Sequence, residues 1–104
     1  MCDNYEYDVV MKKGYVYIIS NKNRTTFYTG VTSTLKERVE KHRKGIQSNF
    51  PSRYNLKDLV YYEELGSMLD AIYREKQIKR WHRKWKIHLI KGLNPEMKDL
   101  FNEL

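Results

Sequence analysis

The chain has 104 residues and a formal net charge of +7, with 20 lysines and arginines against 13 aspartates and glutamates. That length has room for one compact domain and not for two. The single cysteine, Cys2, excludes an internal disulfide and a thiolate metal cluster. No run of about 18 apolar residues is present, so we expect a cytoplasmic protein with no membrane contact. The positive charge favours nucleic acid as partner, the alternative being a basic surface that only keeps the protein in solution.

Two strands are predicted after a leader at residues 1–12. The run at residues 15–19 is β-branched and aromatic, which is typical of a strand. Residues 21–24 have turn chemistry, because asparagine tolerates the left-handed backbone of a tight turn. Residues 26–31 form a second run of strand type, so the pair is expected to be an antiparallel hairpin.

A helix is predicted over residues 34–44. Thr34 and Glu37 match a capping box at its start, and Gly45 supplies a stop at its end. The following residues, 46–55, are predicted to form a loop.

The second half of the chain predicts one strand and two helices. Residues 59–62 form the strand, and helical spacing extends over residues 68–91. The apolar residues there form two stripes on nearly opposite sides, which favours two helices with a break near residue 82, the alternative being one helix between two partners. The stripes are Leu69, Ile72 and Tyr73, and then Ile78, Trp81, Trp85 and Leu89.

These elements predict an α+β fold, a three-stranded antiparallel sheet flanked by helices in the order β-β-α-β-α-α. The domain is expected to span residues 13–100, with a short C-terminal tail at residues 101–104.

An arginine and a histidine lie close to the apolar side of the helix at 34–44. Arg38 and His42 are four residues apart and therefore share one face, within about 60° of the stripe of Leu35 and Val39. An unpaired buried charge is costly. The pattern predicts either a cationic pocket between helix and sheet, or an arginine that extends past its apolar neighbours to water.

Tyrosines form the opposite wall of this expected pocket. Tyr15, Tyr17 and Ile19 share one face of the first strand, and Tyr28 shares a face with Gly30 on the second. A glycine inside a strand lets a ligand or another backbone approach closely. Each tyrosine alone is an ordinary strand residue. Their concentration beside an arginine and a histidine indicates a site.

Glu75 has two interpretations. It can form an exposed ion pair with Lys79, four residues on. It can instead hold a hard divalent cation, since carboxylate oxygens suit magnesium or manganese.

A basic segment follows at residues 79–86. Its pattern predicts a helix that buries its indoles and presents a cationic ridge for nucleic acid, with base stacking by the tryptophans as the alternative. The ridge residues are Lys79, Arg80, Arg83, Lys84 and Lys86.

Taken in order, these motifs resemble the GIY-YIG family of nucleases. The matching positions are Tyr15-Val16-Tyr17, Tyr28-Thr29-Gly30, Arg38 and Glu75. The resemblance runs from about residue 14 to residue 100. It is strongest to the small stand-alone bacterial members, the UPF0213 group, which share the Arg-Glu-Lys-x-Ile-Lys-x-Trp pattern of residues 74–81 and the Asn-Pro at 94–95.

Three positions depart from the family pattern. Tyr15 stands where the family has its first glycine, and Thr29 replaces the middle isoleucine. Val31 occupies the position of a lysine in the related repair incision nuclease.

The resemblance implies a divalent-metal-dependent endonuclease that hydrolyses phosphodiester bonds, with DNA as the expected substrate and DNA repair or recombination as the expected setting. It implies one magnesium or manganese ion on Glu75 and a catalytic set of Tyr17, Tyr28, Gly30, Arg38 and His42. Tyr17, its pKa lowered by nearby cations and the metal, would deprotonate or position the attacking water, and Arg38 would brace the phosphate. The alternative is a non-catalytic nucleic-acid-binding module or repair adaptor that retains the fold.

Overall fold

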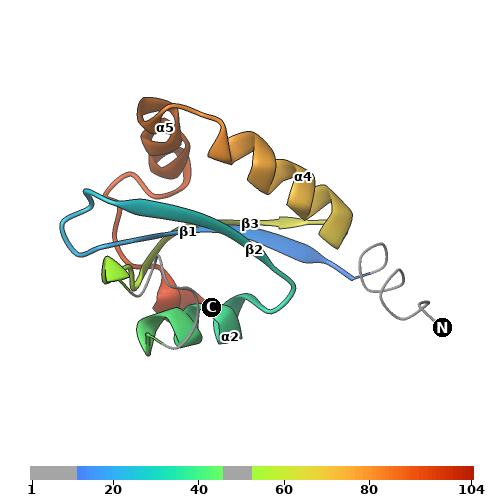
Figure 1. The fold of residues 1–104 in the computed structure, drawn as a ribbon, viewed down its shortest axis with the longest axis horizontal. Coiled ribbons are helices and arrows are strands. Elements are labelled where there is room, and N and C mark those ends of the chain that lie inside the picture. Colours follow the sequence, from blue (N-terminus) through green and yellow to red (C-terminus); the bar gives the residue numbers. More distant parts are fainter. Residues whose placement is uncertain (1–11, 46–52) are drawn as a thin grey trace.

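A three-stranded antiparallel sheet in the order β2-β1-β3 forms the centre of the fold (Figure 1). The computed structural model describes residues 12–45 and 53–104. Its strands are β1 (Gly14–Ser20), β2 (Phe27–Thr32) and β3 (Asp58–Leu65), and its helices are α2 (Leu35–Arg43), α4 (Met68–Lys79) and α5 (Arg83–Leu93), followed by the short 3₁₀ helix η1 (Phe101–Glu103). The predicted α+β class and β-β-α-β-α-α order are confirmed.

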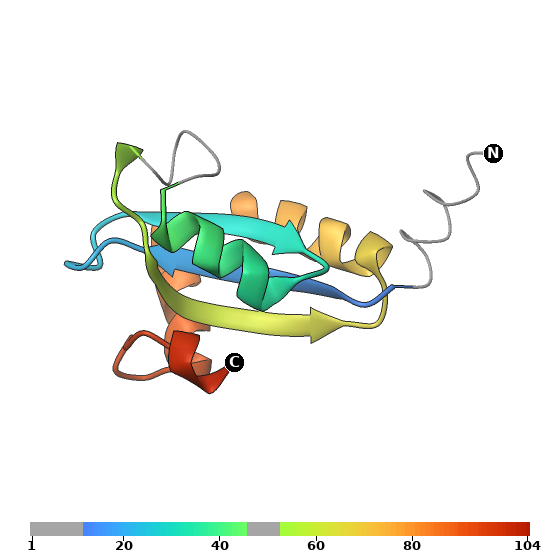
Figure 2. The same cartoon turned by 90° about the horizontal axis from the view of Figure 1, so that it is seen from below.

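The sheet is covered on both faces (Figures 1 and 2), because side chains of a strand alternate between its two sides. Helices α4 and α5 cover one face, where the buried cluster is Val16, Ile18, Val60, Tyr61, Ala71, Ile78 and Ile90. Helix α2 and the C-terminal segment cover the other, where the cluster is Tyr17, Ile19, Leu35, Val39, Leu56, Leu59 and Leu100. The continuous apolar run of β1 follows from its central position between two cores.

Helix α2 begins where the sequence predicted, but the hydrogen bonding at its N-terminus is not the predicted one. The Thr34 side chain makes no capping hydrogen bond. Instead the Thr34 amide donates to Oγ1 of Thr32 at 3.0 Å, so the predicted capping box is wrong. The stop is confirmed: Gly45 has a φ of 69°, and its amide donates to the carbonyl of His42 at 3.0 Å.

The break between α4 and α5 is confirmed, but the buried face of α4 is not the predicted one. Leu69 and Tyr73 are 47% and 71% exposed, whereas Ala71 and Ile78 are fully buried. The reason lies at Gly14, where an added Cβ would sit 2.6 Å from the Cβ of Ala71. The helix approaches β1 closely through the small side chain of Ala71, whereas hydrophobic periodicity favours large side chains.

The C-terminal segment folds back along β3. The buried amide of Asn94 donates to the carbonyl of Val60 at 3.0 Å and to that of Lys98 at 2.7 Å. Residues 101–104, predicted as a tail, pack through Phe101 and Leu104 against the α2 side of the sheet.

The loop predicted at 46–55 lies largely outside the described residues, as does all but the last residue of the predicted leader. Among the described residues, no helix is long and apolar enough to cross a membrane.

Candidate active site

A buried hydrogen bond joins β1 to α2. The Tyr17 hydroxyl lies 2.9 Å from Nε2 of His42, and the two side chains are 1% and 3% exposed. His42 reaches the sheet because it is on the buried side of α2 with Leu35 and Val39. The predicted position of His42 next to the apolar stripe of the helix therefore accounts for this contact.

Gly30 makes room for the Tyr17 ring. The two residues are direct partners in the β1–β2 register. A Cβ added to Gly30 would lie 2.4 Å from both Cζ and Oη of Tyr17. The ring therefore lies over the glycine backbone of the edge strand, and any side chain at position 30 would displace it.

Burial controls the protonation of Tyr17. It raises the pKa of the phenol to about 12, and the neighbouring Arg38 guanidinium opposes that rise only in part. Tyr28 and Glu75 also act on this pKa, and both raise it. Arg38 alone therefore does not bring the pKa of Tyr17 below its ordinary value, because desolvation outweighs it, and the expected effect of a metal stays a prediction.

His42 is neutral for the same reason. Burial, followed by the charge of Arg38, lowers its pKa to about 4. The pKa values of Tyr17 and His42, about 12 and about 4, differ by about 8. Moving the phenol proton onto the imidazole is therefore unfavourable. The pair is an uncharged hydrogen-bonded dyad at neutral pH.

Glu75 belongs to α4, which covers the face of the sheet opposite to the one that α2 and His42 cover. It is only 9% exposed, and its carboxylate pairs with Nζ of Lys79 at 2.6 Å. The Lys79 ammonium lies 5.6 Å from the ring centroid of Tyr28 on β2. The ion pair predicted by the i, i+4 spacing exists, but it is held against the edge strand and its carboxylate is buried.

Six predicted site residues thus come together around the edge strand β2. Tyr28 contributes a ring 6.0 Å from that of His42, in an edge-on arrangement. The six come from four elements: Tyr17 from β1, Tyr28 and Gly30 from β2, Arg38 and His42 from α2, and Glu75 from α4.

The donor set is compatible with one hard divalent cation. Within residues 12–45 and 53–104, no three acidic, histidine or cysteine side chains gather, so Glu75 would be the carboxylate ligand. Magnesium commonly binds through one or two carboxylates, with water and substrate phosphate completing its shell. A cation at Glu75 would compete with the Lys79 ammonium for the same carboxylate.

The predicted cationic ridge is divided by the break between α4 and α5. Lys79 and Arg83 border β2, with the Arg83 guanidinium 5.3 Å from the ring centroid of Phe27. Lys86 lies close enough to Lys79 for that charge to lower its pKa, after the larger effect of burial. Arg80 and Lys84 line two other hollows on the surface.

The indoles behave differently from each other. Trp81 is partly buried against the α4–α5 face of the sheet, with the Arg74 guanidinium 5.4 Å from its ring centroid. Trp85 is 59% exposed, so the prediction that both tryptophans are buried is wrong for Trp85.

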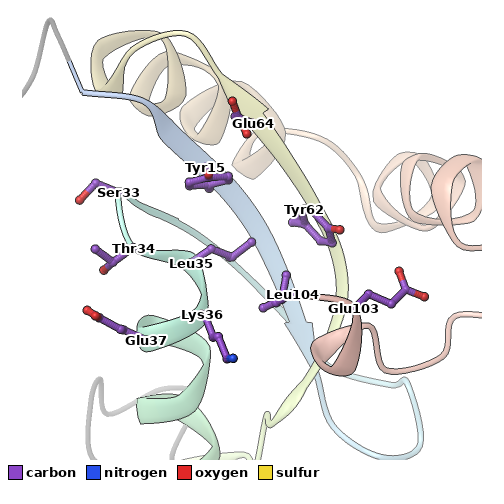
Figure 3. A pocket seen from close by; sticks show the side chains of 10 residues that line it. All are labelled: Tyr15, Ser33, Thr34, Leu35, Lys36, Glu37, Tyr62, Glu64, Glu103 and Leu104. Atoms are coloured by element: carbon purple, nitrogen blue, oxygen red, sulfur yellow. The ribbon is translucent and has the colours of Figure 1, made fainter.

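A separate hollow of about 510 Å³ lies between the start of α2, β3 and the C-terminal turn (Figure 3). Tyr15, Tyr62, Leu35 and Leu104 form its apolar part (Figure 3). Its charged lining residues are three glutamates (Glu37, Glu64 and Glu103) and one lysine, Lys36. This lining disfavours phosphate, and none of the predicted site residues belongs to it.

Sequence reasoning missed the contact of Lys79 with Tyr28. The spacing to Glu75 predicted an ion pair, but only the packing of α4 across β2 brings Lys79 onto the strand. The exposure of Trp85 was also missed, because helical spacing does not reveal which face of α5 is covered.

Comparisons with known proteins agree with this architecture. The family model described as the GIY-YIG catalytic domain matches residues 13–88. A UPF0213 protein of Syntrophus aciditrophicus is 36% identical over 90 residues, covering 83% of this chain and 98% of the relative. The UPF0213 protein SH2523 of Staphylococcus haemolyticus is 34% identical over 80 residues, covering 77% and 96%.

A solved structure has the same fold. The solution NMR structure of the UPF0213 protein BH0048 from Bacillus halodurans matches with a TM-score of 0.53 at 26% identity, covering 81% of this chain and 88% of that one. The chain belongs to the GIY-YIG family, a family of nuclease catalytic domains. Within that family it is similar to the UPF0213 proteins.

The packing of Tyr17 over Gly30 predicts that Gly30→Ala destabilises the domain. The added methyl overlaps the phenol ring, so the ring must move and strain its bond to His42. We expect the free energy of unfolding to fall by about 1–3 kcal/mol in urea denaturation. Gly66→Ala is the matched control, because a Cβ there meets nothing within 4 Å. Equal, small effects of the two substitutions would contradict the packing argument.

The neutral His42 predicts a specific acid sensitivity. Its pKa is lowered from 6.5 to about 4 on folding, so between these pH values the unfolded chain binds more protons than the folded one. Stability therefore decreases as pH falls through this window. His42 should account for a loss of about 2 kcal/mol between pH 7 and pH 5.

The measurement is urea denaturation of wild type and His42→Gln at both pH values. Wild type should lose more stability than the variant, and the control His88→Gln, at an exposed histidine, should behave as wild type. Parallel losses in wild type and His42→Gln would show that His42 titrates normally.

Proposed function

We propose that this protein is a divalent-metal-dependent endonuclease that hydrolyses phosphodiester bonds, acting on DNA in repair or recombination. One observation carries the proposal: the buried Tyr17–His42 hydrogen bond lies within the electrostatic influence of both Arg38 and Glu75. Burying so many polar groups at one sheet edge costs stability, which is typical of functional sites. Membership of a nuclease family supports the same conclusion.

Glu75 is the residue that would hold the metal. It is buried and its charge acts on Tyr17, so it would supply one anionic oxygen donor near the site. A magnesium or manganese ion bound there would supply Lewis-acid stabilisation of charge on the phosphate and its leaving oxygen.

Arg38 is the proposed phosphate-binding residue. Its guanidinium acts on the pKa values of both Tyr17 and His42, so it lies near both side chains. A planar guanidinium can donate two parallel hydrogen bonds to phosphate oxygens and remains charged throughout the reaction. It would stabilise the negative charge that develops as the phosphodiester is attacked.

Tyr17 and His42 are proposed to orient the attacking water as neutral groups. With a pKa of about 12, Tyr17 keeps its proton at neutral pH and can both donate and accept a hydrogen bond. His42 fixes the direction of that hydroxyl. Tyr28 flanks the same position, and Gly30 leaves the ring of Tyr17 in place.

The bordering cations are proposed to bind the nucleic-acid backbone. Lys79 and Arg83 lie beside β2 and Lys86 lies within the influence of Lys79; in this proposal all three contact phosphate rather than base edges. Phosphate contacts position a protein without reading sequence, so binding should show little sequence preference.

The proposal predicts that Glu75→Gln removes cleavage and preserves binding. The substitution is nearly isosteric but deletes the anionic ligand, and metal stabilisation is worth several kcal/mol. We expect the single-turnover cleavage rate in magnesium to fall by about 100-fold or more. Binding measured in EDTA should be unchanged or tighter, because a negative charge is lost.

Glu96→Gln provides a matched control, since it removes one charge from an exposed glutamate outside the site. It should cut and bind as wild type. If wild type and Glu75→Gln cut equally well, Glu75 does not hold the metal. If wild type binds but cuts none of a panel of branched, flapped, nicked and single-stranded substrates, the protein is a non-catalytic binding module.

A further inference from the structure

The net charge of the chain is concentrated in one segment. Residues 76–95 contain seven lysines and arginines and no acidic residue, whereas the remainder of the chain has 13 basic and 13 acidic residues. This segment runs from the last turn of α4 through α5. Its cations are Lys76, Lys79, Arg80, Arg83, Lys84, Lys86 and Lys91.

An exposed indole lies within this basic segment. Trp85 is 59% exposed, although tryptophan is one of the side chains most strongly buried on average. Its ring meets that of His88 edge-on, at 84° and with 6.2 Å between centroids. Together with Lys84 these residues line a hollow of about 460 Å³. More than half of the Trp85 side-chain surface is thus exposed to solvent next to the cation Lys84.

The start of α5 also favours an anion near Trp85. Arg83 and Lys84 occupy its first turn, where the helix dipole disfavours positive charge. No acidic residue occupies that turn, and the N-cap His82 makes no side-chain capping bond. A bound phosphate would offset this unfavourable arrangement.

Helix α5 leads from this exposed face to the candidate active site. Arg83 lies over Phe27 of β2, and Lys86 is influenced by Lys79, which pairs with Glu75. Trp85 lies between Arg83 and Lys86 in the chain. At 100° per residue, however, the indole points about 160° away from Arg83 around the helix, so a nucleic acid that contacts both must pass around α5.

We propose that Trp85 stacks against an unpaired base, so that the substrate carries a single-stranded segment. This inference rests on the proposed function for its nucleic-acid substrate. Bases inside a duplex are already stacked on each other, so an exposed indole can receive only a base that has left the stack. Lys84 and His88 would contact the flanking backbone.

A second copy of the chain fits this face poorly. A symmetric dimer would place the same patch on both partners, bringing two segments without acidic residues against each other. Charge complementarity therefore favours a polyanion.

The test compares the binding of full-length wild type and variants to three labelled probes in EDTA, by fluorescence anisotropy. The probes are a single strand, a blunt duplex of the same sequence, and that duplex with a single-stranded overhang. Trp85→Leu should weaken binding to the two probes with unpaired bases by about 5–100-fold, because one stacked base is worth about 1–3 kcal/mol. Binding to the blunt duplex should change by less than about twofold.

Two further variants separate stacking from apolar contact. Trp85→Phe keeps an aromatic face and should retain most of the affinity. Tyr73→Leu is the matched control, because it removes an aromatic residue that is 71% exposed but lies outside the basic segment. It should bind all probes as wild type. Stacking should also quench the fluorescence of wild type on the single strand, and this quenching should be absent in Trp85→Leu, which retains only Trp81.

The outcomes distinguish the inference from the proposed function. If wild type binds no probe at low salt, nucleic acid is not the partner and both fail. If wild type binds and Trp85→Leu binds every probe with the affinity of wild type, only the stacking inference fails. The same holds if Trp85→Leu loses affinity equally for the duplex and the single strand. If wild type sediments as a dimer that Trp85→Leu dissociates, Trp85 belongs to an interface between copies and the inference is overturned.

Discussion

The hydroxyl of Tyr17 is buried inside the domain, and a buried hydroxyl is costly unless it has a hydrogen-bond partner. That requirement organises much of the surrounding structure. The ring can lie over the edge strand only because position 30 is a glycine. The hydroxyl is satisfied only because α2 directs His42 toward the sheet at 2.9 Å. A strand, a glycine on its neighbour and a helix are thereby held in one arrangement.

Burial also determines the chemistry available at this position. It raises the pKa of Tyr17 to about 12 and lowers that of His42 to about 4, so both groups are neutral in the pH range where most proteins operate. Arg38 is the charge that acts on both, and Glu75 adds the opposite charge from α4. The site thus combines a neutral dyad with separated positive and negative groups. This combination suits binding of phosphate, water and a cation at the same sheet edge.

Local patterns in the sequence were sufficient for the parts of the fold that depend on short spacings. Strand alternation placed Tyr17 and Ile19 on one side of β1, and the i, i+4 relation placed Arg38 and His42 on one side of α2. The break between α4 and α5 followed from the change of apolar stripe near residue 82. These features need only the period of a strand or helix.

Features that depend on tertiary packing could not be read in this way. The close approach of Ala71 to Gly14 determines which face of α4 packs against the sheet. The spacing of apolar residues in the sequence does not predict such a contact. The direction of the Tyr17 pKa shift depends on how much water is excluded, which only the assembled structure defines. The exposure of Trp85 likewise depends on which side of α5 other elements cover.

The central claim is that this polar cluster cuts a phosphodiester, and the most direct measurement is strand cleavage by wild type and Tyr17→Phe. The substitution removes one hydroxyl and keeps the ring over Gly30. On a panel of nicked, flapped, branched and single-stranded DNA, with magnesium or manganese, wild type should cut at least one substrate and EDTA should abolish cutting. Tyr17→Phe should bind that substrate but fail to cut it. Cleavage by Tyr17→Phe at the wild-type rate, with its fold verified by circular dichroism, would contradict the account.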